Sequence, residues 1–499
     1  MQKYFFDVTD IVLYVRGETT ISGIQRVALQ VIKAMLKEHG PDRVMLSMWD
    51  QQAQVYAALD ASFLEEMDEF DAVALSNVFF GKQRRHYETV PPLLARYRNN
   101  RLKYAFHLLR ANLAALRRDK RFFEKRFTTL ERWPQEKARA RAMARDKRKA
   151  ARMPEPVSQK RTAVADLISA GDNIIILGAT WNLAPLYKAL AKLQSEQGAQ
   201  VSMMVHDLIP LVKPEHIASD FSDDFYEWLE GSTAYCSRYF ANSQNTGRDL
   251  RAFLDEIGAD HPIDVVPLAQ DLGHKDPEPD PDTTAHMAHL VDQDGVRRAI
   301  LNLTKTPYVL VVGTVETRKN PWRLVQVWSR LIEDRDIDAP KLVFAGKLGW
   351  LIEDFHAALN ATGNLRGWVE IAERPSDREL AFLYKNCLFT AMVSQYEGWG
   401  LPIGEGLGFG KTGVVANNSA MPEVGGDMVE YCDAESINSI YAACRKLISL
   451  PSHREMLEAR VAATQLRTWD DVAANFVAVL QTRRTVPDAE DLKSVAKGG

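Results

Sequence analysis

Short apolar runs recur along most of the chain and alternate with longer segments whose apolar residues are three or four positions apart. The runs have the length of buried strands, and the spaced segments have the period of amphipathic helices. Strands that alternate with helices predict parallel sheets with crossover helices on both faces. The expected strands span residues 3–7, 11–14, 43–48, 173–177, 201–205, 239–241 and 264–268 in the first half, and 308–312, 342–345, 369–372, 387–393 and 414–416 in the second.

The helical pattern is clearest in the second half. Ser376 followed by Glu379 has the spacing of a capping box, which predicts that a helix begins there. Pro402 would occupy the first turn of another helix, where a missing N–H costs little. Residues 419–424 are polar and predict a turn. The expected helices cover residues 27–36, a segment that ends at 193, another that ends at 331, and 377–386, 401–409 and 470–482.

The alternation stops between residues 91 and 151, which predict a helical insertion. One apolar seam runs along it with steps of four and three positions, formed by Leu102, Phe106, Leu109, Leu113 and Leu116. The segment could be a solvated helical arm that packs by this seam. It could instead adhere to anionic lipid headgroups or to an anionic carrier. Nucleic acid is less well supported and is not expected as a partner, because no recognition module accompanies the charge.

The charge distribution singles out the same insertion. The net charge of the 499 residues is −4, yet residues 82–161 hold 25 Lys and Arg against 7 Asp and Glu. A block of this kind usually indicates a partner or a surface. Apolar residues at 46% and charged residues at 26% are typical of a globular protein.

The length predicts two or three domains. A run of alternating Pro and acidic residues at 276–282 is the best candidate for a boundary. We therefore expect an N-terminal domain at 1–272 that carries the insertion at about 82–161, a linker at 273–305, a second domain at 306–466, a C-terminal helix at 467–484 and a disordered tail at 485–499. No apolar run reaches the roughly 20 residues needed to span a bilayer, no secretory signal is visible, and the four cysteines are widely spaced. A cytoplasmic setting is expected, with the inner face of the membrane as a peripheral location.

The stretch 394–406 carries the most informative chemistry. Glu397 and Glu405 flank a glycine-rich turn between an expected strand and an expected helix. Such a turn presents free backbone N–H groups and a positive dipole end to an anion. Carboxylates beside it can accept hydrogen bonds from sugar hydroxyls, which suits a nucleotide sugar. The simpler alternative is an ordinary turn with two solvated glutamates.

Other polar residues fall where parallel strands should end. His206, Asp207 and Ser243 follow expected strands, and ligands of parallel sheets lie beyond that edge. Gly23, which follows Ser22 at a helix start, is a second candidate phosphate cradle. For His206, a buried histidine bonded to the backbone is the alternative.

Four segments together resemble the GT-B glycosyltransferases, and most closely the retaining family called glycosyltransferase family 4. These segments are Ser22 to Arg26, Val205 to Pro210, Val312 to Thr314 with Arg318 to Asn320, and Glu397 to Glu405 with Met421 to Val424. The resemblance implies two Rossmann-like domains that face each other across a cleft, with the basic helical insertion in the first.

The resemblance also implies residue roles. Gly23 would approach the donor phosphate, Lys319 would neutralise the diphosphate, and Glu405 would bind the ribose. Glu397 would contact the transferred sugar, and His206 would lie near it. His206, Glu397 and Lys319 are thus the implied catalytic residues. The implied donor-binding residues are Gly23, Thr314, Arg318, Lys319, Ala372, Arg374, Glu397, Gly398, Trp399, Gly400, Leu401 and Glu405, with residues 372–374 as the base-binding loop.

The sequence departs from the family pattern in three places. Thr314 stands where many members have an arginine, so the diphosphate would depend on Lys319, Arg318 and helix amides. Trp399 replaces a more frequent phenylalanine. The basic insertion is absent from the family core, so its role does not follow from the resemblance.

The function implied is hexose transfer from a nucleotide sugar to a glycan or a polyprenyl-linked glycan in O-antigen or capsule synthesis. GDP-mannose is favoured as donor, while UDP-glucose and dTDP-rhamnose stay open. The reaction would proceed on the front face of the donor, with Glu397 orienting the sugar and not acting as a nucleophile. No cofactor or metal is expected, because no D-x-D motif ends a predicted strand. The alternatives are a sugar-nucleotide epimerase of the same architecture and a non-catalytic protein that binds anionic surfaces.

Overall fold

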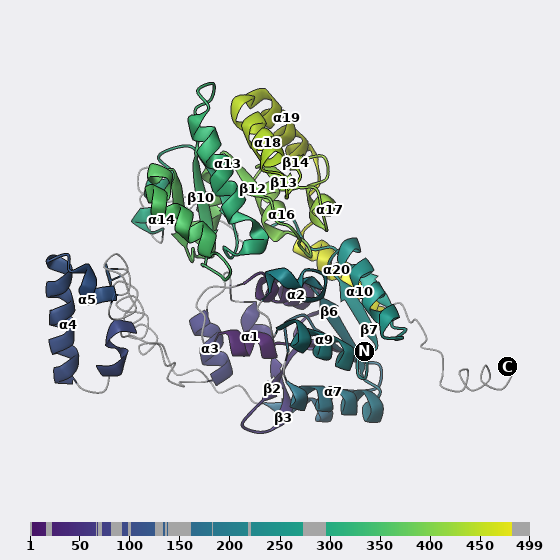
Figure 1. The fold of residues 1–499 in the computed structure, drawn as a ribbon. Helices are drawn as coiled ribbons and strands as arrows, with labels where there is room; N and C mark the ends of the chain where they lie inside the picture. Colours follow the sequence, from purple (N-terminus) through teal and green to yellow (C-terminus); the bar gives the residue numbers. More distant parts are fainter. Residues whose placement is uncertain are drawn as a thin grey trace, which may run out of the picture. The chain divides into compact units, whose positions relative to one another are not determined.

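The computed structural model describes residues 2–15, 22–65, 67, 72–80, 92–97, 101–124, 133–134, 137, 161–181, 183–217, 221–272 and 296–481 (Figure 1). The predicted linker run 276–282, the charged stretch 138–152 and the predicted tail 485–499 lie outside these residues. The chain forms two compact units, which we describe separately. The larger comprises Met1–Ile11, Thr20–Phe70 and Lys160–Gly499, and the smaller comprises Val12–Thr19 and Asp71–Gln159.

The first sheet of the larger unit is mainly parallel, as the alternation predicts. Within the described residues it has eight strands in the order β4-β3-β2-β1-β5-β6-β7-β8. β3 pairs antiparallel with both β2 and β4 at one edge, and the sequence pattern did not predict either β3 or β4. The strands are β1 (Tyr4–Asp7), β2 (Val44–Asp50), β3 (Val55–Asp60), β4 (Thr162–Ala163), β5 (Asn173–Ile176), β6 (Gln200–Val205), β7 (Arg238–Ala241) and β8 (Ile263–Val265).

The second sheet is parallel throughout. Its order among the described residues is β11-β10-β9-β12-β13-β14. All five strands expected in this half are present, and β14 is an addition. The strands are β9 (Tyr308–Val312), β10 (Lys341–Gly346), β11 (Val369–Glu373), β12 (Phe389–Met392), β13 (Gly413–Ala416) and β14 (Glu430–Cys432).

The helices confirm most expectations and correct two. Residues 11–14 belong to α1 and not to a strand, because so short an apolar run fits either element. Residues 421–425 form a short helix where a polar turn was expected. The capping box of Ser376 and Glu379 is confirmed. The helices of this part of the chain are α1 (Thr9–Tyr14), α2 (Gly23–His39), α7 (Ala184–Gln197), α8 (Ile209–Val212), α9 (Phe221–Ser232), α10 (Gln244–Glu256), α12 (Arg298–Leu303), α13 (Pro321–Glu333), α14 (Glu353–Gly367), α15 (Asp377–Asn386), α16 (Leu401–Gly408), α17 (Met421–Gly425), α18 (Ile437–Ser449), α19 (Pro451–Ala463) and α20 (Trp469–Gln481).

The last helix of the described residues, α20, returns from the second sheet to the elements of the first. It packs against α2, and the ring of Phe476 lies 4.8 Å from that of Phe240 on β7. Just before it, Arg467 donates from Nε to the carbonyl of Pro267 at 2.9 Å. The first half, built on the first sheet, and the second half, built on the second sheet, are therefore held together by this C-terminal segment. Further contacts between them are described with the candidate site.

The smaller unit contains α3 (Ala72–Phe80), α4 (Arg101–Leu116) and α5 (Lys120–Glu124). Its core is formed around Ala111, Phe123 and Trp133, which are fully buried. The indole N–H of Trp133 donates to Asn112 on α4 at 3.2 Å. α4 therefore packs into this core through the face that carries Ala111.

The predicted seam of α4 does not face that core. The packed face steps by four and three as well, through Tyr104, Leu108, Ala111 and Ala115. The seam that the sequence singled out is exposed instead, at 85% for Leu102, 62% for Phe106, 59% for Leu109, 43% for Leu113 and 81% for Leu116. The prediction that the arm packs by this seam was therefore wrong. α4 has two apolar faces, and the other one packs into the core.

Candidate active site

A loop between β12 and α16 carries Glu397. Residues 393–400 leave the buried strand, and Gly400 ends the loop with φ 102°, a left-handed conformation that favours glycine. α16 then begins at Leu401, with Pro402 in its first turn as expected. This geometry sets the free N–H groups at the start of α16 beside the glutamate.

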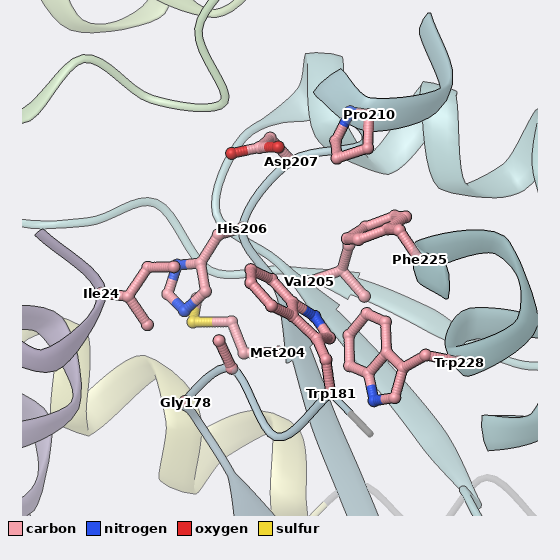
Figure 2. A pocket seen from close by; sticks show the side chains of 11 residues that line it. Ile24, Gly178, Trp181, Met204, Val205, His206, Asp207, Pro210, Phe225 and Trp228 are labelled. Carbon is pink, nitrogen blue, oxygen red and sulfur yellow. The ribbon is translucent and has the colours of Figure 1, made fainter. Parts of the chain in front are cut away.

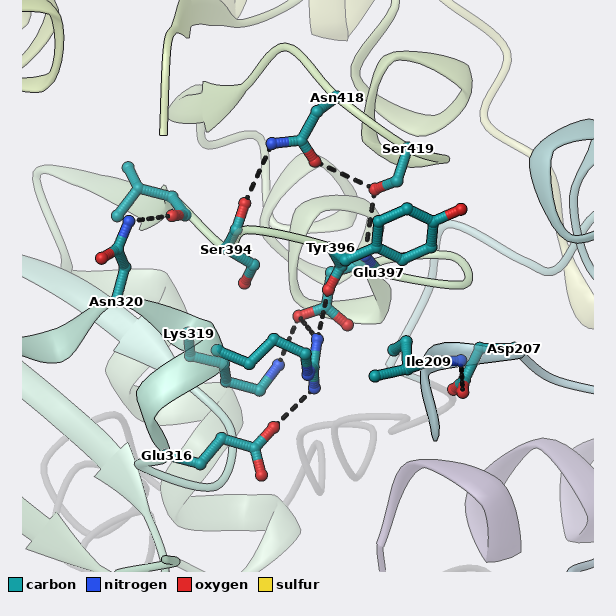
Figure 3. A network of polar contacts seen from close by, with 12 residues as sticks. Asp207, Ile209, Glu316, Lys319, Asn320, Ser394, Tyr396, Glu397, Asn418 and Ser419 are labelled. Carbon is teal, nitrogen blue, oxygen red and sulfur yellow. Dashed lines mark hydrogen bonds and ion pairs between the residues drawn. The ribbon is translucent and has the colours of Figure 1, made fainter. Parts of the chain in front are cut away.

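Two cations converge on the Glu397 carboxylate (Figure 3). Lys319 Nζ and Arg318 Nη1 both lie 2.8 Å from its Oε1. Arg318 also pairs with Glu316 at 2.6 Å and donates to the carbonyl of Tyr396. The backbone N–H of Glu397 donates to Ser419 Oγ at 3.0 Å. The predicted residues Arg318, Lys319 and Glu397 thus form one network, which the sequence could not show.

The network sets the charge of Glu397. Its side chain is almost wholly buried, and burial by itself raises the pKa of Glu397. The nearby charges of Arg318 and Lys319 outweigh that effect and hold the pKa at about 2. Glu397 is therefore a stable carboxylate at neutral pH and a weak base.

Glu405 lies within α16 and is also buried. Tyr384 on α15 donates its hydroxyl to Glu405 Oε2 at 2.6 Å. On the other side, Arg26 Nε lies 4.0 Å from Oε1, which is an ion pair but too long for a hydrogen bond. One oxygen of Glu405 is thus fixed by Tyr384, and the other keeps capacity to accept from a ligand hydroxyl.

Arg26 links α2 to α15 of the second half and to Leu272 at the end of the first half. Its Nη2 lies 2.7 Å from Oδ1 of Asp377, the first residue of α15, and its Nη1 donates to the carbonyl of Leu272 at 3.2 Å. Burial raises the pKa of Glu405, and the Arg26 charge and the Tyr384 hydroxyl offset part of that rise. Arg26 stands in the quoted Ser22 to Arg26 segment, but sequence reasoning gave it no role.

His206 follows β6 and has a definite tautomer. Its Nε2 lies 2.7 Å from the carbonyl oxygen of Leu177, which can only accept, so Nε2 carries the proton. Burial lowers the pKa of His206 below its ordinary value. The imidazole is therefore neutral at pH 7 and leaves Nδ1 as an acceptor. The hydrogen bond to the backbone agrees with the simpler alternative, a buried structural histidine. The acceptor Nδ1 agrees with the functional alternative, in which His206 contacts a ligand.

The two halves approach each other closely at Gly398 and at Gly23. A Cβ on Gly398 would lie 1.9 Å from the carbonyl oxygen of His206 and 2.8 Å from Asp207 Cβ. A Cβ on Gly23 would lie 3.3 Å from Leu401 Cδ1. The predicted residues of the first half, Gly23 and His206, are thus brought against the predicted Gly398 and Leu401.

The residues after β9 support the Lys319 side chain. Gly313 has φ 126°, and a Cβ there would lie 3.0 Å from Lys319 Cε. Thr314 Cγ2 packs against Gly349. Lys319 itself ends a 3₁₀ turn, Thr317–Lys319, and Asn320 then starts α13 with φ 65°. The short turn and the glycine aim the lysine at Glu397.

The predicted base-binding loop, residues 372–374, lies at the end of β11. Ala372 is buried in a core cluster, so only its backbone could reach a ligand. Arg374 has φ 48° and donates its N–H to Gly346 at 3.1 Å. Arg297 braces the loop, since it donates to the Glu373 carbonyl at 3.1 Å and pairs with Glu379 at 2.7 Å.

Further polar contacts across the two halves were missed by sequence reasoning. Glu423 accepts from the N–H groups of Gln244 at 2.8 Å and Asn245 at 2.9 Å, at the start of α10. The hydroxyl of Tyr396 accepts from Asn245 Nδ2 at 2.7 Å. Two features of the sequence could have indicated these contacts. Glu423 belongs to the motif segment Met421 to Val424, and Ser243 follows an expected strand. Trp399, a residue of the loop between β12 and α16, is buried at 6% exposure.

A small cavity adjoins His206 in the first half (Figure 2). Its volume is about 70 Å³, and it is lined by aromatic side chains from the β5 end and from α9, with His206 and Asp207 at one side. Among the described residues, the indole N–H groups of Trp181 and Trp228 are buried without a hydrogen-bond partner. Apolar walls with a few polar groups are typical of a small-molecule site. The aromatic members of the lining are Trp181, Phe225 and Trp228.

Three features of the described residues bear on the remaining expectations. No three His, Cys, Asp or Glu side chains among them are grouped so that they could hold a metal ion. The four cysteines are free and buried. No described helix combines the length and apolar character needed to cross a membrane.

Sequence comparison finds one matching family model and several curated relatives. Residues 292–463 match the family model "Glycosyl transferases group 1". The O-antigen chain mannosyltransferase B of Escherichia coli is 32% identical over 171 residues, which cover 34% of this chain and 44% of the relative. The serotype-specific mannosyltransferase WbdA of E. coli is 24% identical over 285 residues, which cover 57% of this chain and 34% of the relative. The chain thus spans less than half the length of these curated relatives.

Structural comparison identifies the fold. The Anabaena protein Alr3699/HepE, solved with UDP and glucose, superposes with a TM-score of 0.53 at 13% identity, covering 97% of this chain and 100% of that one. Sucrose-phosphate synthase from Thermosynechococcus elongatus superposes with a TM-score of 0.51 at 14% identity, covering 99% and 100%. The GT-B fold expected from the sequence is confirmed.

Proposed function

We propose that the protein is a retaining hexosyltransferase, because residues 292–463 match the family model "Glycosyl transferases group 1" and the chain has a GT-B fold. The proposed donor is GDP-mannose, since the matched E. coli relatives are named mannosyltransferases. The proposed acceptor is a surface glycan such as an O-antigen chain, free or carried on a polyprenyl lipid. The relative named for the O-antigen chain supports that class of acceptor.

The observation that carries this proposal is the convergence of Lys319 and Arg318 on Glu397 beside the start of α16. A nucleotide sugar offers a diphosphate next to a hydroxyl-rich ring. Two cations and a helix N-terminus suit the diphosphate, and a buried carboxylate suits the hydroxyls. On donor binding, Lys319 would be shared between Glu397 and a phosphate oxygen. Glu405 would receive the ribose through its Oε1.

The chemistry proposed needs no covalent intermediate. The bond from the anomeric carbon to the phosphate oxygen breaks, and the bond to the acceptor oxygen forms on the same face. The acceptor proton passes to the leaving phosphate. Glu397, with a pKa of about 2 and two cations on one oxygen, is a poor nucleophile and is proposed to hold sugar hydroxyls. His206 Nδ1 would accept from a sugar hydroxyl.

The proposed reaction needs no metal ion, because protein groups would stabilise the charge of the leaving group. The charge of the departing diphosphate would be met by Lys319, Arg318 and the amides at the start of α16. The cavity beside His206 is proposed to receive part of the acceptor, because Trp181, Phe225 and Trp228 offer apolar faces and indole donors there. Unchanged turnover after treatment with EDTA would support the metal-free mechanism.

The test is a thermal-shift series with GDP-mannose, UDP-glucose and dTDP-rhamnose, followed by transfer assays with and without an acceptor glycan. A donor at 100 times its dissociation constant should stabilise the protein by about 2.7 kcal/mol. Lys319→Ala should lose that shift and lower turnover by about 10²-fold. NMR of the product should show the anomeric configuration of the donor.

Lys347→Ala is the matched control, because Lys347 follows β10 in the same half and is not in the Glu397 network. The control should keep the full shift. Absence of any shift with the three donors, or equal shifts in wild type and Lys319→Ala, would contradict the proposal. Conversion of the sugar nucleotide without acceptor would indicate an epimerase instead.

A further inference from the structure

The exposed seam of α4 is an unusually large apolar feature for a helix surface. Its five members are between 43% and 85% exposed, and they form a continuous stripe because their spacing repeats every three or four residues. The stripe runs from Leu102 to Leu116 on α4, so it extends for about 21 Å at 1.5 Å per residue. Contiguous apolar surface of this kind marks an interaction site.

Basic residues border this stripe on one side. Lys103, Arg110 and Arg117 are exposed and seven residues apart, which aligns them in a row next to the stripe. Arg110 additionally lies over the ring of Phe122, 5.7 Å from its centroid. α4 contains no acidic residue. The apolar stripe with a basic edge is the arrangement of a helix that lies in a membrane interface.

The charge of the helix argues against self-association through the same stripe. Two copies packed by it would bring the row of Lys103, Arg110 and Arg117 close to the same row or to Asn112 and Ala105 of the other copy, with no acidic group on either helix. Two heptads are also short for a coiled coil without charge pairs. An anionic surface complements the row, and residues 82–161 carry 25 basic against 7 acidic residues.

We propose that the exposed stripe of α4, together with its basic row, docks the protein on an anionic lipid surface. The leucine and phenylalanine side chains enter the boundary between headgroups and acyl chains, while the basic row pairs with lipid phosphates. The opposite face of α4 stays packed on Ala111, Phe123 and Trp133. This inference does not depend on the proposed transferase activity.

The test is flotation of the full-length protein with phosphatidylcholine vesicles and with vesicles that contain phosphatidylglycerol. We expect flotation with the anionic vesicles and little with the neutral ones, with a decrease as salt rises. L109D/L113D should lower the bound fraction by at least about tenfold, since it places charges in the stripe. R110Q/R117Q should lower it by roughly fivefold for each residue.

Matched controls come from other exposed helices of the chain. M456D alters an apolar residue that is 41% exposed on α19, and K188Q/K192Q removes two exposed basic residues from α7. Both should bind as wild type does. L102D/L116D alters the two most exposed positions of the stripe, so it tests the same surface if L109D/L113D fails to fold.

Three outcomes would overturn the inference. These are no binding to any vesicle, equal binding to neutral and anionic vesicles, and stripe variants that bind as the wild type does. Analytical sedimentation without vesicles tests whether the stripe instead binds a second copy of the chain. A wild-type dimer that L102D/L116D converts to a monomer would assign the stripe to a second copy of the chain.

Discussion

Lys319 Nζ lies 2.8 Å from Oε1 of Glu397, so the cation and the carboxylate that the resemblance assigned to different parts of a donor form one ion pair. Arg318 reaches the same oxygen at the same distance. A diphosphate that binds here therefore meets cations whose positions are already fixed. Such preorganisation avoids the cost of ordering them during the reaction.

The ion pair predicts a pH-dependent contribution to stability. The pKa of Glu397 is lowered to about 2, so its stabilising effect is complete above its ordinary pKa and is lost as pH falls towards 2. Glu397→Gln should cost roughly 3 kcal/mol at pH 7 and progressively less below about pH 4.5. Urea unfolding of wild type and variant at several pH values measures this difference. A difference that stays constant from pH 7 to pH 3 would show that the ion pair does not stabilise the protein.

The hydroxyl of Tyr384 predicts an effect on donor binding. Tyr384→Phe removes the 2.6 Å hydrogen bond to Glu405, which raises the pKa of Glu405 further and loosens its carboxylate. We expect a loss of about 1 kcal/mol in stability and a roughly three- to tenfold higher KM for the donor. Steady-state kinetics with varied donor measure the second effect.

Tyr308→Phe is the matched control for that substitution. Tyr308 is also buried, but it donates its hydroxyl to the carbonyl of Leu383 at 2.7 Å and not to Glu405. It should lose similar stability and keep the donor KM of the wild type. Equal KM values for the two variants would separate Glu405 from donor recognition.

The close approach at Gly398 predicts that no side chain is tolerated there. A Cβ would lie 1.9 Å from the carbonyl oxygen of His206, and a backbone atom cannot rotate away. The two loops must separate in Gly398→Ala, so we expect about a 10²-fold lower kcat/KM and a loss of about 1–3 kcal/mol. Kinetics and thermal unfolding measure the two effects.

Gly231→Ala is its control, because Gly231 lies in α9 and nothing is within 4 Å of the added Cβ. This variant should be neutral or up to about 1 kcal/mol more stable, since alanine favours a helix. Wild-type kcat/KM in Gly398→Ala would mean that the contact with His206 is not part of the catalytic arrangement.

Local patterns were sufficient for most strands of the two sheets. The strands of the second half are apolar runs bounded by turn residues, and all five expected runs became β9 to β13. Residues 11–14 failed because four apolar residues fit a strand or a helix equally. β3 was missed because it pairs antiparallel with β2 across a tight turn, in a half where parallel crossovers were expected.

The site was predictable as a set of residues but not as a set of contacts. Glu397 and Glu405 were visible from their glycine-rich context, while their partners Lys319, Arg318, Tyr384 and Arg26 are distant in sequence. The same limit explains α4, where two faces have equivalent spacing and only the folded core decides which one is buried. The spacing of apolar residues identifies the apolar faces of a helix, but tertiary packing determines which of them is buried.

The ion pairs of Arg26 should stabilise the contact between the first and second halves of the larger unit. It is buried, pairs with Asp377 at 2.7 Å and lies 4.0 Å from Glu405. Arg26→Met should leave the two carboxylates uncompensated and cost about 3 kcal/mol or more at neutral pH. Burial already raises the pKa of Glu405, and loss of Arg26 raises it further. A carboxyl with a raised folded pKa loses stability as pH rises through that pKa, so the deficit of Arg26→Met should be larger at pH 8 than at pH 5.

A double-mutant cycle with Glu405→Gln resolves this coupling. In Arg26→Met/Glu405→Gln the buried charge at position 405 is absent, so part of the lost stability should return and the pH dependence of the deficit should flatten. Urea unfolding of the four proteins at pH 5 and pH 8 gives the interaction energy directly. If the two substitutions are additive at both pH values, Arg26 acts through Asp377 alone, and the link between α2 and α16 carries no electrostatic coupling.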